Sequence, residues 1–266
     1  RELTKIQEKH MRDVAKTLNN LGNLHKTLYD FNKAEKCLNE SYSIYKSLSR
    51  DDAKLKIHHI IVLRNLALVH GLMGDDNAAI KEIKIALDII SSLALKDPEA
   101  YNCDLAYLLL DYAALYSKKG NYSETISKYL QSLSMFRELS KMNPNKHRGR
   151  LAWTLNKYVI FHKMDNQYTA TALPYFTEAL NIYEDLAQKS SIVYDSSVAR
   201  ALNLLADIYF KLDNYNEAYS MQMKAYTIYL SLSEKNPVKY NSNVAWTLNY
   251  LAIINWKKCH IEQAIE

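Results

Sequence analysis

The alternation of apolar and polar residues is clearest between Val198 and Leu232, where it describes two helices joined by a turn. In the first half, apolar residues recur every three or four positions, which places them on one face of an α-helix: Val198, Leu202, Leu205, Ile208, Tyr209 and Leu212. Asp213 and Asn214 interrupt the pattern, and both residue types favour turns and helix N-caps. A second stripe follows at Tyr215, Ala218, Met221, Ala225, Ile228, Tyr229 and Leu232. Each helix has only one apolar face, so the pattern predicts a helical hairpin that packs against neighbouring helices.

The same hairpin pattern repeats along the whole chain. A small residue early in each second helix recurs at intervals of 45, 46, 47, 46 and 46 residues, at Ala34, Ala79, Thr125, Ala172, Ala218 and Ala264. Another small residue follows seven positions later, at Ser41, Ala86, Ser132, Ala179 and Ala225. Each first helix carries an apolar pair such as Leu205-Ala206, usually with a ring-bearing residue four positions after its first member. Because small residues let two helices approach closely, the repeat predicts hairpins stacked on one another.

These positions resemble the tetratricopeptide repeat. The family pattern is a Leu-Gly pair, a Tyr, a Gly/Asn-Tyr turn and two Ala, and the fifth copy matches it with Leu205-Ala206, Tyr209, Asn214-Tyr215, Ala218 and Ala225. The resemblance covers essentially the whole chain. It implies an all-α fold, a right-handed α-solenoid (superhelix) of antiparallel helix pairs. The usual period of the family is about 34 residues, so a spacing near 46 resembles its long-repeat variety.

The repeat predicts a single array over residues 1–266 that begins and ends inside repeat units. Residues 1–9 are expected to be the tail of a preceding second helix, since RELTK at 1–5 resembles RELSK at 137–141. The repeats are expected at residues 10–50, 55–96, 103–142, 149–189, 196–235 and 242–266, the last truncated just after a turn at Cys259-His260. Connectors with Asp-Pro or Asn-Pro are expected at 96–102, 143–146 and 236–241. Both ends indicate an excerpt from a longer array or from a multidomain protein.

Composition narrows the class of protein. Five Gly and four Pro among 266 residues fit long helices with short turns. No apolar run is long enough to span a bilayer, and we expect no secretory signal at the start of the chain, because Arg1-Glu2-Leu3 lies in charged sequence. The three cysteines, Cys37, Cys103 and Cys259, are odd in number and far apart, which favours reduced thiols and a cytoplasmic protein. The net charge of +5 is mixed with acidic residues and does not by itself call for nucleic acid.

Candidate catalytic and metal-binding residues form no recognisable motif. His25, His70 and His162 occupy the ring position that tyrosine holds in other repeats, and stacked helices place successive rings about 10 Å apart. We therefore expect packed rings with one hydrogen bond rather than zinc ligands. His58 and His59 are adjacent on a helix and point in different directions. HExxH, a Gly-rich phosphate loop and GxSxG do not occur, so we expect a non-catalytic protein with no cofactor and no metal.

The resemblance also implies a ligand groove lined by the first helices. The family's groove positions lie five, two and one residues before the Leu of the Leu-Gly pair, and two, five and six after it. Carried over, they include Asn19, Asn20, Asn23, Arg64, Asn65, Trp153, Asn156, Lys157, Arg200, Asn203, Asp207, Trp246, Asn249, Tyr250 and Trp256. The Asn amides suit an extended peptide backbone, or they bond the adjacent helix. The tryptophans are binding anchors, or they pack between repeats. The family's carboxylate clamp is incomplete, because Leu110 and Ala114 stand where cations belong.

The resemblance implies a non-catalytic scaffold that binds a peptide or protein partner in this groove. An alternative is the sensor or regulatory region of a larger signalling enzyme, such as a kinase, NTPase or protease, which the interrupted ends favour. Another is a helical-repeat groove for single-stranded RNA, which ranks lower because Asp111 and Leu204 interrupt the basic residues. No membrane partner is expected, and self-association through the bare last helix stays open.

Overall fold

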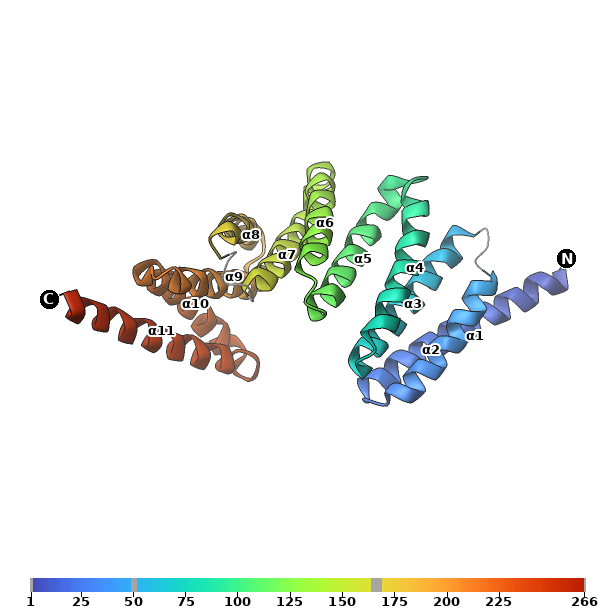
Figure 1. The fold of residues 1–266 in the computed structure, drawn as a ribbon, viewed down its shortest axis with the longest axis horizontal. Helices are drawn as coiled ribbons and strands as arrows, with labels where there is room; N and C mark the ends of the chain where they lie inside the picture. Colours follow the sequence, from blue (N-terminus) through green and yellow to red (C-terminus); the bar gives the residue numbers. More distant parts are fainter. Residues whose placement is uncertain (1, 49–51, 164–168, 266) are drawn as a thin grey trace. The chain divides into compact units, whose positions relative to one another are not determined.

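The computed structural model describes residues 2–48, 52–163 and 169–265, and every regular element within them is an α-helix (Figure 1). The eleven helices of this described part are α1 (Glu2–Thr27), α2 (Phe31–Leu48), α3 (Ala53–Met73), α4 (Asp76–Ala94), α5 (Pro98–Lys118), α6 (Tyr122–Met142), α7 (Pro144–Lys163), α8 (Thr169–Lys189), α9 (Ser191–Lys211), α10 (Tyr215–Lys235) and α11 (Pro237–Ile265). The chain divides into two compact units, Arg1–Met135 and Phe136–Glu266, and the division falls within α6.

Helices pack on their neighbours in sequence within each unit. In the first unit α1 packs on α2, α2 on α3, α3 on α4 and α4 on α5. In the second unit α7, α8, α9, α10 and α11 follow one another in the same way. First helices of successive pairs are also in contact: α1 contacts α3, and α7 contacts α9. This is the contact pattern of a repeat protein, in which each pair meets only its neighbours, and it confirms the predicted all-α array.

The small residues that mark the repeat are buried between helices. The small residue early in each second helix is 1% exposed or less, at Ala34, Ala79, Thr125, Ala172 and Ala218. The small residue seven positions later is equally buried, at Ser41, Ala86, Ser132, Ala179 and Ala225. Gly22 of α1 shows how closely two helices approach, since a Cβ atom there would lie 2.6 Å from Cγ of Leu38 on α2. Such contacts leave no room for larger side chains, because protein interiors are close-packed.

Two serines of the repeat make the same hydrogen bond. The hydroxyl of Ser41 on α2 donates to the carbonyl of Ala15 on α1 at 2.7 Å, and that of Ser132 on α6 donates to the carbonyl of Ala106 on α5 at 2.8 Å. Both bonds join residues 26 positions apart. A buried hydroxyl needs a partner, and the equivalent backbone carbonyl supplies it in both pairs.

The turn between the two helices of a pair has the same backbone form in four repeats. Tyr29, Gly74, Gly120 and Asp213 have positive φ angles of 59°, 88°, 71° and 56°, the left-handed conformation that ends many helices. The amide of the next residue donates to the carbonyl five positions back, as Asp75 does to His70 at 2.9 Å. The backbone geometry therefore repeats with the sequence.

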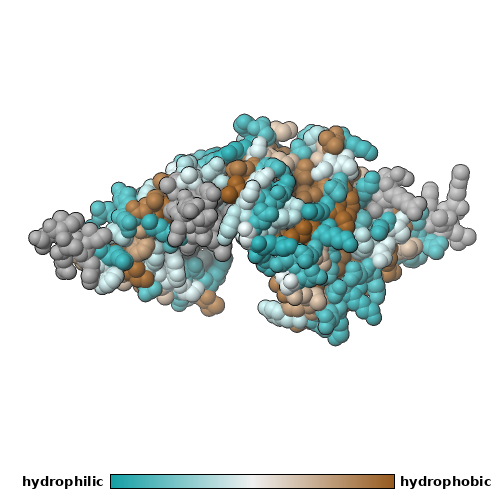
Figure 2. All heavy atoms as spheres, in the orientation of Figure 1, coloured by the Kyte–Doolittle hydropathy of each residue, from teal (hydrophilic) through white to brown (hydrophobic). Residues whose placement is uncertain are grey.

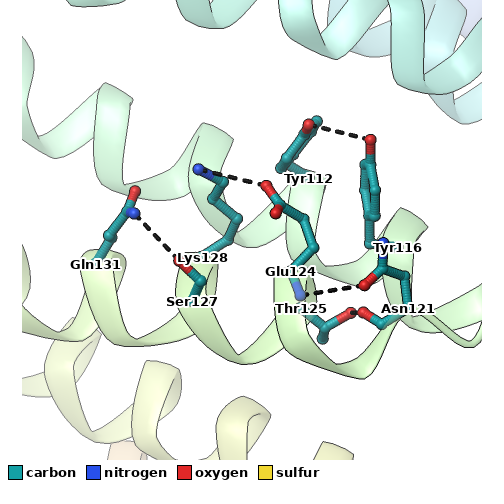
Figure 3. A network of polar contacts seen from close by, with 8 residues as sticks. All are labelled: Tyr112, Tyr116, Asn121, Glu124, Thr125, Ser127, Lys128 and Gln131. Carbon is teal, nitrogen blue, oxygen red and sulfur yellow. Dashed lines mark hydrogen bonds and ion pairs between the residues drawn. The ribbon is translucent and has the colours of Figure 1, made fainter.

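The turn between α5 and α6 shows how the second helix of a pair begins (Figure 3). The side chain of Asn121 accepts a hydrogen bond from the backbone N–H of Glu124 at 3.2 Å, and the hydroxyl of Thr125 donates to the Asn121 carbonyl at 2.7 Å. On α5, the hydroxyl of Tyr112 donates to that of Tyr116 at 3.2 Å. The cap satisfies N–H groups that would otherwise lack partners in the first turn of α6.

The proline-containing connectors are mostly helical, unlike the prediction. Pro98, Pro144 and Pro237 are the first residues of α5, α7 and α11. The Asp or Asn before each proline caps the new helix, and Asp97 accepts from the N–H of Ala100 at 3.1 Å. Proline suits this position because its φ is already helical and the first turn does not need its N–H. Each Asp-Pro or Asn-Pro pair thus ends one helix and begins the next.

Both ends of the chain also differ from the prediction. Residues 2–9 are no separate tail, because α1 runs without a break from Glu2 to Thr27, and neither Gly nor Pro interrupts its beginning. The turn expected at Cys259-His260 is absent, and α11 continues to Ile265. Every other turn after a first helix that the structure describes has Asp or Asn as its capping residue, and this segment has neither. Ala264 therefore belongs to α11 and not to a second helix.

His70 of α3 lies between carboxylates of the two flanking helices. Its Nε2 is 3.2 Å from Oε1 of Glu35 on α2, and its Nδ1 is 2.8 Å from Oε1 of Glu82 on α4. Burial lowers the pKa of His70, but the hydrogen bond to Glu35 and the charge of Glu82 outweigh it and raise that pKa. Burial raises the pKa of Glu82 to about 7, although the charge and hydrogen bond of His70 lower it, and the charges of Glu35 and Asp75 raise it slightly further. The sequence predicted one hydrogen bond for this ring, and the Nε2 bond to Glu35 agrees with it, while Nδ1 faces the carboxylate of Glu82 as an ion-pair neighbour. The side chain of His162 lies outside the described ones.

Replacing Gly74 with Ala should destabilise the protein by about 1–2 kcal/mol, because a side chain is strained at this left-handed φ even though no atom lies within 4 Å of the added Cβ. Gly71 inside α3 is the matched control. A Cβ there would lie 3.6 Å from Leu115, an ordinary contact, and Ala favours a helix over Gly by about 0.5–1 kcal/mol. Urea denaturation measures both changes, and effects of the same sign would contradict this account of the turn.

The contacts of His70 should make stability depend on pH. His70 and Glu82 both bind a proton more tightly in the folded chain than at their ordinary pKa values of 6.5 and 4.5. Their contribution is therefore complete at low pH and is lost as the pH rises through the folded values, so the unfolding free energy should fall between about pH 5 and pH 8. Glu82→Gln should flatten this fall, and Glu40→Gln at an exposed site of α2 should not. Urea titrations across the range test it, and coinciding profiles for wild type and Glu82→Gln would refute it.

Candidate functional site

A pocket of about 350 Å³ lies along α3 in the first unit. All six groove positions that the family pattern places around Leu66 line it, residues 61, 64, 65, 68, 71 and 72. Residues of α5 complete the wall, among them Ala114, Leu115 and Lys118. Its volume falls within the range of about 300–1,000 Å³ that is usual for ligand pockets. The spacing in the sequence therefore brings these α3 residues to one concave surface.

The apolar part of this pocket is open to solvent. Ile61, Leu68 and Leu72 are 42%, 50% and 52% exposed, and all three lie on α3. Figure 2 shows hydrophobic residues in several places at the surface, among hydrophilic ones. Isolated exposed leucines are ordinary, but these three share one pocket and so offer a partner a continuous apolar contact.

Arg64 and Asn65 of the pocket each pair with a side chain of a neighbouring first helix. Nε and Nη2 of Arg64 on α3 each lie 2.7 Å from Oδ2 of Asp111 on α5. Nδ2 of Asn65 on α3 donates to Oδ1 of Asn19 on α1 at 2.8 Å. The charge of Arg64 is thus balanced within the pocket, and two of the predicted Asn residues bond each other across adjacent helices, although Asn19 does not line the pocket.

Two further predicted residues of α1 lie outside the pocket. Asn20 is exposed. Asn23 is half-buried and accepts a hydrogen bond from Nζ of Lys26 on the same helix at 2.9 Å. Neither approaches the residues that line the pocket closely enough to be part of it.

A smaller pocket of about 60 Å³ lies between α7, α8 and α9 in the second unit. Four predicted groove residues line it, Trp153, Asn156, Lys157 and Arg200. Trp153 is 40% exposed, whereas Asn156 is only 6% exposed. Nζ of Lys157 lies 5.3 Å from the centre of the Trp153 ring, a distance at which cation and ring attract each other.

A third group of predicted residues joins α9 to α11. The hydroxyl of Tyr250 donates to Oδ1 of Asp207 at 3.0 Å. The ring of Trp246 stacks on that of Tyr250, with centres 5.3 Å apart and planes 11° from parallel. Burial raises the pKa of Tyr250, and the charge of Asp207 raises it further, so this phenol stays protonated at neutral pH.

The remaining predicted residues of the second unit line neither pocket. Asn203 is half-buried, Asn249 is exposed, and Trp256 is 56% exposed. Nζ of Lys257 lies 5.5 Å from the Trp256 ring centre. These three side chains are not brought together with the two groups above.

Some residues of the two pockets escaped the sequence analysis. Leu72 sits six positions after Leu66, and the same groove spacing could have found it. Lys118 and Leu115 of α5 also line the larger pocket. Tyr183 and Ser197 line the smaller one, and they lie outside the groove positions of the repeat, so no signal in the pattern marks them.

Other kinds of site find little support in the described residues. No three His, Cys, Asp or Glu side chains among them converge as metal ligands would. None of their helices is both long and apolar enough to cross a bilayer. None of the three cysteines belongs to a disulfide. What the geometry offers is two concave surfaces with polar and apolar groups that can contact a ligand.

Two parts of the chain match known families of repeats. Residues 14–52 and residues 199–231 each match a family model described as tetratricopeptide repeat. The first corresponds to α1 and α2, and the second to α9 and α10. No curated protein sequence matches the chain.

Solved structures with the same fold are distant in sequence. BtubC (BKLC) from P. vanneervenii has a TM-score of 0.69 at 16% identity, over 88% of this chain and 86% of that one. A signal-transduction ATPase with a tetratricopeptide repeat sensor from Pyrococcus horikoshii has a TM-score of 0.63 at 16% identity, over 96% of this chain and 38% of that one. The apo form of RapI has a TM-score of 0.63 at 14% identity, over 97% and 74%. The chain therefore contains tetratricopeptide repeats, and its sequentially packed helices form a tetratricopeptide-like array.

Proposed function

We propose that the chain is a non-catalytic interaction module that binds a peptide or a segment of a partner protein along its first helices. Repeats of this kind typically serve as protein-interaction modules, and the pocket along α3 is the observation that carries the proposal. It combines exposed apolar side chains with paired polar groups. Such a surface suits a segment that contributes a hydrophobic side chain, because burying it removes apolar area from water on both sides.

The charges of the pocket favour a polypeptide over RNA. Arg64 is neutralised by Asp111 at 2.7 Å, and Lys118 donates to the carbonyl of Gly71 at 3.2 Å. A nucleic-acid groove needs unpaired cations that follow the phosphates. The two cations of this pocket are instead engaged within the protein.

We further assign five helix pairs, α1–α2 to α9–α10, to the long-repeat variety, with α11 as an unpaired first helix. The equivalent turn residues Gly74 and Gly120 lie 46 positions apart, which supports that period. A reducing cytoplasmic setting agrees with three cysteines that form no disulfide. The sensor role printed for the Pyrococcus horikoshii ATPase is a second candidate, and it would use the same surface.

Leu68→Ala should weaken the binding of peptides selected from a random library displayed on phage, with the whole chain as bait. Losing an apolar contact of the pocket should cost about tenfold in affinity, as measured by fluorescence anisotropy. The melting temperature should hardly change, because Leu68 is half exposed and Ala is a good helix former.

Leu130→Ala is the matched control, since Leu130 is a leucine of a second helix, α6, with 39% exposure and no place in the pocket. It should bind the selected peptides as the wild type does. Equal affinity of both variants for every selected peptide, or a library that yields no binder, would count against the proposed function.

A further inference from the structure

Two of the groove positions that line the larger pocket carry very small residues. Gly71 of α3 lies five positions after Leu66, and Ala114 lies opposite it in the lining, on α5. A Cβ atom on Gly71 would lie 3.6 Å from Cδ2 of Leu115 and 4.0 Å from Nζ of Lys118. Both are ordinary contact distances. The space beside Gly71 can therefore hold a side chain, and α3 itself does not supply one.

The second unit has an aromatic ring at the position that Gly71 holds in the first. Phe210 of α9 lies five positions after Leu205, the leading residue of its own repeat pair. Its ring centre lies 5.6 Å from that of Tyr250 on α11 and 5.3 Å from that of Tyr215 on α10. Aromatic pairs favour such distances. The repeat thus places a ring between neighbouring first helices at this groove position when the residue is Phe.

The helix opposite differs between the two units in the same sense. Where α11 has Tyr250 and Ile253, α5 has Asp111 and Ala114 at the equivalent positions. The first unit therefore has a pocket of about 350 Å³ where the second unit places large side chains of its own. That volume is the share of about a dozen water molecules, at about 30 Å³ each in the liquid, which is enough for the side chain of an aromatic residue.

The lining of this pocket suits the face of a ring. Ile83 is buried and Leu68 is half exposed, so both offer apolar contact. A charged group would lose its hydration against such walls, which costs free energy. The guanidinium of Arg64 is 41% exposed, and its Nε and Nη2 are both held at 2.7 Å by Oδ2 of Asp111. A guanidinium plane stacks on aromatic faces, and an aliphatic side chain offers it no such face.

We propose that the pocket along α3 binds one aromatic side chain of the partner peptide, in the place that Phe210 fills with its own ring in the second unit. The ring contacts Gly71 and Leu68 of α3 and Leu115 of α5, and Arg64 stacks on it. The inference rests on the proposed function, for which it names the type of residue that anchors the partner.

Peptides selected by the whole chain from the random library test the ligand side. Phe, Tyr or Trp should be enriched at one position, and a synthetic peptide with that residue is the probe. Its Ala version should bind about thirty- to a hundredfold weaker, as for an anchor residue. Its Leu version should bind about tenfold weaker, because Leu keeps apolar contact and loses the flat face. Equal or tighter binding of the Leu version, or selection without an enriched ring, would overturn the inference.

Variants that fill the pocket test the protein side by the same anisotropy measurement. Gly71→Phe gives α3 the residue that α9 has, and Ala114→Phe fills the space from an exposed position of α5. Each should weaken binding of the aromatic peptide about thirty- to a hundredfold, as the Ala version of the peptide does. Ala100→Phe, the same substitution at an exposed position of α5 outside the pocket, is the control and should bind normally.

Circular dichroism melting identifies any variant that no longer folds. Should Gly71→Phe melt early, Ala114→Phe decides the result, because its position is exposed. Unchanged affinity of a folded Gly71→Phe or Ala114→Phe chain would show that the ring does not enter this space and would overturn the inference.

The two proposals fail in different ways. Peptides that depend on Leu68 but bind equally well with Leu in place of the ring would overturn the aromatic anchor and leave the interaction module standing. A chain that selects no peptide at all would count against both.

Discussion

The close approach of paired helices at small buried residues is the constraint on which the structure depends. A Cβ on Gly22 would fall 2.6 Å from Leu38, and the equivalent small positions of the later pairs are as fully buried as Ala34. Because packing at this distance tolerates no added atom without strain, the crossing is fixed in each pair. The four turns within pairs that the structure describes are fixed as well, by a left-handed residue and the hydrogen bond beyond it.

Once crossing and turn are fixed, successive first helices present equivalent residues side by side. This is why Arg64 meets Asp111 and Asn65 meets Asn19, although 47 and 46 residues separate them in sequence. The bonds between Ser41 and Ala15 and between Ser132 and Ala106 follow from the same register inside the pairs. Long-range contacts in this chain are thus consequences of a local period, as expected for a protein whose units contact only their neighbours.

That dependence explains how much could be predicted from the sequence. Helix pairing and burial of the small residues follow from the period, and so does the identity of the α3 residues that line the larger pocket. Helix ends were harder, because a proline such as Pro98 can open a helix as well as end one. The long α1 and α11 were missed for the opposite reason, since nothing in their sequence stops a helix.

The sequence pattern did not predict the contacts of the groove residues, because these contacts depend on which side chains of the neighbouring helices lie opposite each one. Asn19 and Asn156 hold equivalent positions, yet Asn19 bonds Asn65 of the next first helix and Asn156 is buried beside Tyr183 of α8. The partner of Asn156 comes from a second helix, which the groove positions do not include. The repeat period determines the backbone position of each side chain. The neighbouring side chains determine which of its atoms form hydrogen bonds.

The same backbone frame therefore yields chemically different pockets. Along α3, Leu68 and Leu72 face solvent and the charge of Arg64 is taken up by Asp111. Between α7 and α9, Arg200 has no such counterpart and the oxygen of Asn156 lacks a donor. The small buried residues that hold the helices together are the same in both places, so exchanging groove residues changes the ligand chemistry of one repeat without disturbing the crossing below it. In the interaction module proposed above, the residues offered to a partner can thus vary from repeat to repeat while the packing that supports them stays constant.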